Sequence, residues 1–232
     1  MFHEGFTSQH RAIGTAAAWA VFFLGVVYAV TTVLGFLSLK SPQDPIGDPY
    51  FTIMELLIVL MAPLMVVSMV AVHAYAPAEV KVYSLTALCF MILLAGITSS
   101  VHFVILTVSR QIETAGLTGV PLLLSFKWPS VAYTLDILAW DWFFALSMLF
   151  AAPVFKGGRL EIAVRILMIV SGVLSLAGLI GVPLADMQVR NIGIIGYAGV
   201  ALVVFLLLGI VFGRTHPVPG DTERSRDSQS GV

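Results

Sequence analysis

The sequence predicts an all-α integral membrane protein built as a bundle of six transmembrane helices. Two features of the composition and one of the pattern predict this fold class. Of the 232 residues, 59% are hydrophobic and only 11% are charged, whereas a soluble domain carries about 25% charged residues. The mean hydropathy is high, at +0.98. Six separate stretches are apolar over the ~20 residues that a helix needs to cross a bilayer.

The six expected helices form one transmembrane domain over residues 1–213. They cover residues 12–38, 52–76, 82–109, 130–155, 162–184 and 192–213. The first stretch is longer than the apolar core of about 7–15 residues found in a signal peptide, so we interpret it as a membrane helix. Short connections at 75–81, 156–159 and 186–190 predict that neighbours in sequence pack antiparallel.

The charge distribution predicts that both termini are cytoplasmic. Eight Lys and Arg residues fall on the side of the N-terminus and four on the opposite side, and positive charge is enriched on the cytoplasmic side. A plasma membrane of bacterial type is the expected location, with the tail 214–232 disordered in the cytoplasm. The connections 40–51 and 110–129 are then external. The oily part of the second either lies along the interface, anchored by Phe126 and Trp128, or folds back over the bundle.

Several classes of function and partner find no support in the composition. The net charge is -1 and there is no basic cluster, so we expect the lipid bilayer and no nucleic acid as a partner. The single cysteine, Cys89, excludes a disulfide framework. Small residues such as Ser171 and Ser175 in the fifth helix predict close packing between helices. Nothing in the sequence indicates an oligomeric state.

Four ionisable residues lie inside the apolar stretches and are the best indicators of function. They are Glu55 in the second helix, His102 in the third, and Asp136 and Asp141 in the fourth. Because a charged residue at the centre of a membrane helix costs about 2.5–3.5 kcal/mol, these groups should face inward and pair. The helical rise places Glu55, His102 and Asp136 ~6–12 Å below the outer surface. We therefore expect those three to form one unit, with Asp141 lower and partly separate.

Further polar and aromatic residues share helix faces with these groups. Ser99 is on the face of His102, and Tyr133 and Trp140 are on the face of Asp136. Together with the four ionisable residues they define a hypothetical outward-facing pocket. The aromatic side chains beside Asp136 either line a cavity for an apolar or cationic ligand or pack in the core, which is the commoner role of such rings. The alternative is a network that only locks the helices together. Hydrogen bonds between membrane helices are worth only ~0.6 kcal/mol on average, a small return for burying acids, which favours the pocket.

The leading hypothesis for function is binding or transport of a small molecule, with or without coupling to protons. One alternative is a membrane-embedded enzyme, metal-dependent or acid–base, acting on a lipid-like substrate, and another is a structural or partner-binding membrane subunit. His102 and two carboxylates resemble a zinc ligand set, but no paired metal-binding spacing accompanies them, so we assign neither metal nor cofactor. His73, near the inner end of the second helix, is expected to be interfacial and too distant to join His102 on a haem.

Overall fold

The computed structural model describes residues 5–41, 44–109 and 121–215. Six of its helices are long and apolar enough to cross a membrane: Ser8–Leu37, Tyr50–Tyr75, Ala78–Val108, Val131–Val154, Arg159–Gly181 and Met187–Arg214. The six expected segments are thus confirmed as membrane-spanning candidates. Their ends shift by a few residues, and the last helix begins at Met187 rather than 192. The tail 216–232 lies outside the described residues.

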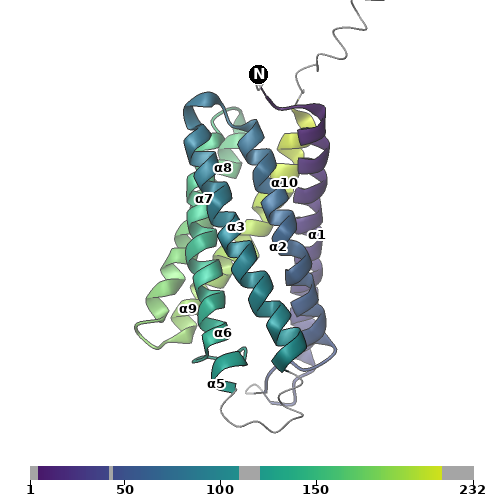
Figure 1. Cartoon of the computed structure of the whole chain (residues 1–232), viewed down its shortest axis with the longest axis vertical. Coiled ribbons are helices and arrows are strands. Elements are labelled where there is room, and N and C mark those ends of the chain that lie inside the picture. Colours follow the sequence, from purple (N-terminus) through teal and green to yellow (C-terminus); the bar gives the residue numbers. More distant parts are fainter. Residues whose placement is uncertain (1–4, 42–43, 110–120, 216–232) are drawn as a thin grey trace, which may run out of the picture.

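Helices three, four and six are each composed of several pieces (Figure 1). The first two helices are α1 (Ser8–Leu37) and α2 (Tyr50–Tyr75). The third comprises the 3-10 turn η1 (Ala78–Val80), α3 (Lys81–Val104) and the π-helical η2 (Ile105–Ser109). After the short α5 (Pro121–Leu124), the fourth comprises α6 (Val131–Ile137), the π-helical η3 (Leu138–Phe144), α7 (Ala145–Ala151) and η4 (Ala152–Val154). The fifth is α8 (Arg159–Gly178) with η5 (Leu179–Gly181), and the sixth is α9 (Met187–Ile194), the π-helical η6 (Ile195–Val200) and α10 (Ala201–Arg214).

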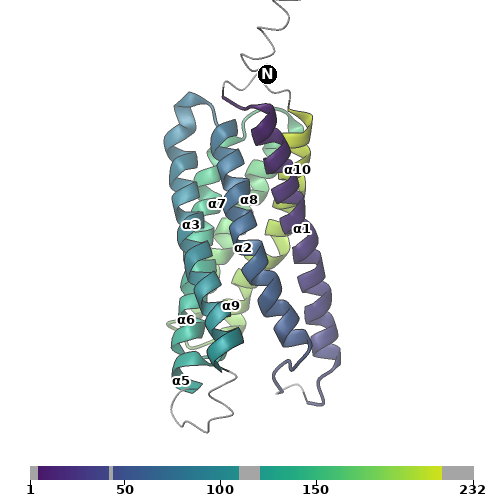
Figure 2. The same ribbon diagram turned by 45° about the vertical axis from the view of Figure 1, so that its right-hand side comes forward.

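The helices follow one another around a ring, and the sixth closes the ring against the first. α1 packs on α2, α2 on α3, α3 on α7 and α7 on α8, while α10 contacts both α8 and α1. The start of α1 and the end of α10 therefore lie at the same end of the bundle (Figures 1 and 2). The side of the membrane that this end occupies remains a prediction from the charge count.

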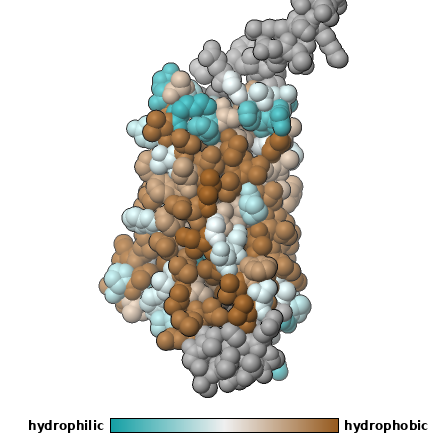
Figure 3. Space-filling view, in the orientation of Figure 1, coloured by the Kyte–Doolittle hydropathy of each residue, from teal (hydrophilic) through white to brown (hydrophobic). Residues whose placement is uncertain are grey.

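The outer surface is apolar over most of its height. Large hydrophobic side chains such as Phe23, Leu60, Phe103 and Ile166 are more than half exposed. Figure 3 shows hydrophobic residues covering most of one face of the bundle, with hydrophilic residues gathered at the end near the N-terminus. Soluble monomeric proteins rarely expose apolar surface of this extent to water. The surface is compatible with lipid contact all around the helices.

Small residues bring the fifth and sixth helices close together. The Ser171 hydroxyl donates to the carbonyl of Gly196 at 2.9 Å. A Cβ on Gly196 would lie 2.6 Å from the Ser171 carbonyl oxygen, so only glycine fits there. This contact confirms the close packing expected from Ser171 and Ser175. It also brings η6 against α8, which positions the first half of the sixth helix beside the fourth.

Candidate functional site

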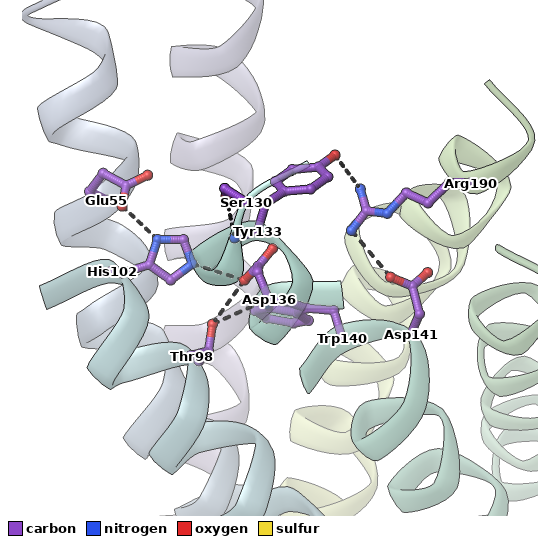
Figure 4. A network of polar contacts seen from close by, with 9 residues as sticks. All are labelled: Glu55, Thr98, His102, Ser130, Tyr133, Asp136, Trp140, Asp141 and Arg190. Atoms are coloured by element: carbon purple, nitrogen blue, oxygen red, sulfur yellow. Dashed lines mark hydrogen bonds and ion pairs between the residues drawn. The ribbon is translucent and has the colours of Figure 1, made fainter. Parts of the chain in front are cut away.

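Three helices contribute one buried ionisable side chain each to a hydrogen-bonded triad. Glu55 is in the second turn of α2, His102 is near the end of α3, and Asp136 is near the end of α6. Nδ1 of His102 lies 2.6 Å from Oε2 of Glu55, and Nε2 lies 3.2 Å from Oδ1 of Asp136. No more than 5% of any of these residues is exposed. The expected contact of Glu55, His102 and Asp136 is therefore present (Figure 4).

The triad must hold at least two protons to satisfy its own contacts. Each of the two nitrogen–oxygen contacts of His102 requires one hydrogen. An imidazolium supplies both, whereas a neutral ring supplies one and leaves the other to a protonated carboxyl. In either arrangement two carboxyls and one imidazole with two protons carry a net charge of minus one. With these two protons alone, the triad is one positive charge short of neutrality inside the bundle.

Two further side chains orient the carboxylate of Asp136. The Thr98 hydroxyl contacts Oδ1 of Asp136 at 3.5 Å, and the Trp140 indole N–H donates to the Thr98 hydroxyl at 3.0 Å. Thr98 is fully buried, whereas Ser99 is partly exposed. The sequence interpretation selected Ser99, three residues before His102, but Thr98 at four residues is the hydroxyl that reaches the site. Both spacings share a helix face.

Asp141 pairs with an arginine that the sequence interpretation placed in a connection. Arg190 lies in the first turn of α9, with Nη2 3.2 Å from Oδ2 of Asp141. Both residues are buried, at 0% exposed for Asp141 and 3% for Arg190. The helix begins early because the side chain of Asp186 caps it by accepting from the N–H groups of residues 188 and 189. The cap at Asp186 was the sequence signal that could have placed Arg190 inside the sixth helix.

Two tyrosines and two glycines complete the surroundings of the Asp141–Arg190 pair. Nη1 of Arg190 contacts the Tyr133 hydroxyl at 3.4 Å, and its guanidinium carbon lies 5.3 Å and 5.7 Å from the ring centroids of Tyr133 and Tyr197. A Cβ on Gly178 would lie 2.6 Å from Oδ1 of Asp141, and one on Gly193 would overlap that oxygen. The carboxylate is therefore seated between two helix backbones. Asp141 is separate from the triad, as expected.

Polar residues of the site adjoin three π-helical segments. η2 begins three residues after His102, η3 contains Trp140 and Asp141, and η6 contains Tyr197. Such segments interrupt the regular α-helical hydrogen bonding and occur frequently at functional sites. A π-helix winds more loosely than an α-helix, so the angle around the helix axis between Asp136 and Asp141 differs from the ~140° that a regular α-helix would give.

A cavity of about 390 Å³ is bordered by His102 and Asp136 of the triad and by Arg190 of the Asp141–Arg190 pair. Its polar lining comprises His102, Asp136 and Arg190 together with Tyr28, Thr32, Tyr133 and Tyr197. The rest is apolar, with side chains that include Ile58, Met61, Met65, Trp140, Leu202 and Phe205. Four of the seven candidate residues therefore line the cavity: His102, Tyr133, Asp136 and Trp140. Glu55, Asp141 and Ser99 are not part of the lining.

Phe126 covers the cavity beside His102. The two ring centroids are 5.4 Å apart, and the Phe126 ring also packs edge-on against Tyr133 at 5.3 Å. For this residue the structure decides between the two interpretations of the connection 110–129, because Phe126 folds back over the bundle. Residues 110–120 of the same segment lie outside the described residues.

The contacts of His73 and the metal hypothesis can be assessed from the same structure. Nδ1 of His73 lies 2.9 Å from the Ser84 hydroxyl near the end of the bundle that holds the termini. His73 thus takes no part in the triad. Among residues 5–41, 44–109 and 121–215, no group of three or more His, Cys, Asp or Glu residues has an arrangement that could hold a metal ion.

No protein-family model, curated protein sequence or solved structure matches this chain. The geometry of the cavity and of the two ionic groups beside it is therefore the basis for proposing a function. The structure supports a multi-pass membrane protein with buried ionisable residues facing an internal space.

Proposed function

We propose that the protein binds a small molecule in the cavity between its helices and transports it, with the triad of Glu55, His102 and Asp136 exchanging protons with the ligand site. One observation carries this proposal: His102, Asp136 and Arg190 all border a cavity of about 390 Å³. Ligand pockets typically enclose ~300–1,000 Å³ and combine a mostly apolar wall with a few polar groups. The lining described above has that composition.

A network that only locked the helices would not need this space. Protein interiors are packed at the density of organic crystals, and voids larger than a water molecule are few. Here the imidazole of His102, the carboxylate of Asp136 and the guanidinium of Arg190 all line open volume. Intramembrane ionisable groups that line a cavity typically mark the path of a substrate or an ion.

The position of the cavity supports an outward-facing site. It lies in the half of the bundle nearer the connections after α1, η2 and η5, away from the end at which α1 begins and α10 ends. If the termini are cytoplasmic, as the Lys and Arg distribution predicts, this half is external. Glu55, one turn into α2 from the same end, then lies between the aqueous surface and His102.

A ligand screen with a blocking variant tests the proposal. Thermal unfolding of the purified protein is measured against a panel of small acids, bases and neutral compounds. Ala198 lines the cavity, so Ala198→Trp should abolish stabilisation by any compound that binds there. Val203, on the same helix but 43% exposed at the outer surface, provides the control Val203→Trp. Compounds that stabilise the wild type and both variants equally, or no stabilising compound at all, would contradict the proposal.

Proton coupling requires a separate measurement in reconstituted vesicles. A gradient of a compound identified in the screen should change the internal pH, and Asp136→Asn should abolish this change while leaving vesicle tightness unaffected. Uptake without any movement of protons would leave binding and transport intact but remove the coupling. Chemical turnover of the compound instead of uptake would identify the enzymatic alternative.

A further inference from the structure

We infer that the cavity takes an organic cation, with an ammonium group at Asp136 and an apolar remainder among the side chains of α2 and α10. This inference depends on the proposed function, because it names the ligand class of the same cavity. Among the described residues of the site, the negative charges around the cavity exceed the positive charges by one.

The buried charges of the site leave one negative charge uncompensated. Arg190 and Asp141 form a pair at 3.2 Å that is neutral as a whole. The triad carries a net charge of minus one when its two internal contacts hold one proton each. A net charge buried away from water is expensive. The site therefore favours one additional positive charge, which is either a third proton or a cationic ligand.

Asp136 presents a carboxylate oxygen to such a ligand. The contacts that His102 and Thr98 make with Asp136 both go to Oδ1. The second oxygen points away from both of them (Figure 4), and Asp136 is one of the residues that line the cavity. An ammonium group entering the cavity can thus reach Asp136 without displacing His102.

The walls suit the rest of an organic cation. Phe126, whose ring centroid is 5.4 Å from that of His102, and Trp140, four residues after Asp136, both line the cavity. Aromatic faces attract desolvated cations. Farther along, Ile58, Met65 and Leu202 provide an apolar surface. A ligand that combines a charged amine with an aromatic or aliphatic body is complementary to both parts.

An anionic ligand fits the same walls less well. Arg190 is the cationic group of the lining, but it is already engaged by Asp141 and held between the rings of Tyr133 and Tyr197. A carboxylate bound at Arg190 would compete with a fully buried Asp141 and would raise the negative charge of the site by one more unit. The charge of the ligand is therefore the property that the experiment should vary.

Cation binding and protonation of the triad should exclude each other. Without ligand the neutral triad holds three protons, and with a monocation bound it holds two, so one proton leaves for each cation that enters. The other titratable or charged groups facing the triad and the cavity are Tyr28, Tyr133, Asp141, Arg190 and Tyr197. An alkylammonium titrates near pH ~10.4, as a lysine does, and stays charged between pH ~5 and ~8. Over that range its binding should therefore tighten as the pH rises.

The test compares three probes of one shape and different charge: 4-phenylbutylammonium, 4-phenyl-1-butanol and 4-phenylbutyrate. Calorimetry with the protein in a neutral detergent should show the ammonium binding at least about tenfold more tightly than either other probe, a factor worth ~1.4 kcal/mol. One proton should be released for each ammonium bound, as measured in two buffers of different ionisation enthalpy. Ala198→Trp should remove binding, which excludes partition into the micelle.

Matched variants locate the charge that recognises the probe. Asp136→Asn and Glu55→Gln should each reduce the preference for the ammonium to about that for the alcohol. Glu161→Gln should not, because Glu161 accepts from the Tyr75 hydroxyl at 2.7 Å near the opposite end of the bundle. Equal binding of the three probes, or tightest binding of 4-phenylbutyrate, would overturn the ligand class while supporting the cavity. Absence of binding by all three probes would overturn the inference, and the broader screen would then decide on the proposed function.

Discussion

Replacing His102 by leucine should destabilise the protein more than replacing either of its carboxylate partners. The imidazole bridges Glu55 at 2.6 Å and Asp136 at 3.2 Å, and all three groups are buried. Removing one member of a buried ionic pair typically costs ~3–5 kcal/mol, because the partner is left uncompensated. His102→Leu strands two carboxyls, so we expect a loss of ~3–5 kcal/mol. Glu55→Leu or Asp136→Leu leaves one nitrogen of His102 without a hydrogen-bond partner, so we expect a loss of ~1.5–3 kcal/mol in the free energy of unfolding.

Double-mutant cycles isolate the contacts from the rest of each substitution. The free energy of unfolding is measured in mixed detergent micelles for the single and double variants. His102 should couple with Glu55 and with Asp136 by more than ~0.5 kcal/mol, because each pair is in direct contact. His102 should couple much less with Asp141, whose contact is with Arg190. Additive effects of His102 and Asp136, or stronger coupling of His102 to Asp141, would refute the arrangement.

Three further predictions concern packing, orientation and His73. Gly193→Ala should lower the free energy of unfolding by ~1–3 kcal/mol, because the new Cβ overlaps a buried Asp141 oxygen. The control Gly199→Ala should unfold like the wild type, because the atom nearest to its new Cβ is 4.0 Å away. Equal thermal stability of the two variants would contradict this prediction. Reporter fusions after residue 232 and within 156–159 should read cytoplasmic and those within 40–50 and 112–126 external, and an external C-terminal reporter would reverse the orientation. His73→Gln should change the stability by less than ~0.5 kcal/mol in the same micelle assay, and a larger loss would show that the contact with Ser84 matters.

The fold and the triad could be predicted because they depend on local properties of the chain. Apolar runs of membrane length identify the six helices. Depth along each helix follows from the residue count and the fixed helical rise, so Glu55, His102 and Asp136 could be placed at one level. The cost of burying charge then required them to meet. None of these steps needed knowledge of how the helices pack.

Other parts of the site depend on information that hydropathy does not contain. A charged residue ends an apolar run, so Arg190 was assigned to the connection although the cap at Asp186 marks an earlier start of the helix. The choice between Thr98 and Ser99 depends on a rotation of α3 by one residue, which is set by its neighbours. The cavity is lined by residues of five membrane helices, including residues of the π-helical segments η3 and η6, whose hydrogen bonding leaves no periodic pattern in the sequence.

The most direct test of a ligand-binding cavity is an experimental density map of the protein, extracted from its own membranes into lipid nanodiscs. Native mass spectrometry is carried out on the same sample. We predict density for a small molecule in the cavity, within hydrogen-bonding distance of Asp136 and between His102 and Arg190. We also predict a bound mass that is lost in Ala198→Trp and kept in Val203→Trp. A cavity closed by the surrounding side chains, with no bound mass in the wild type, would contradict both predictions.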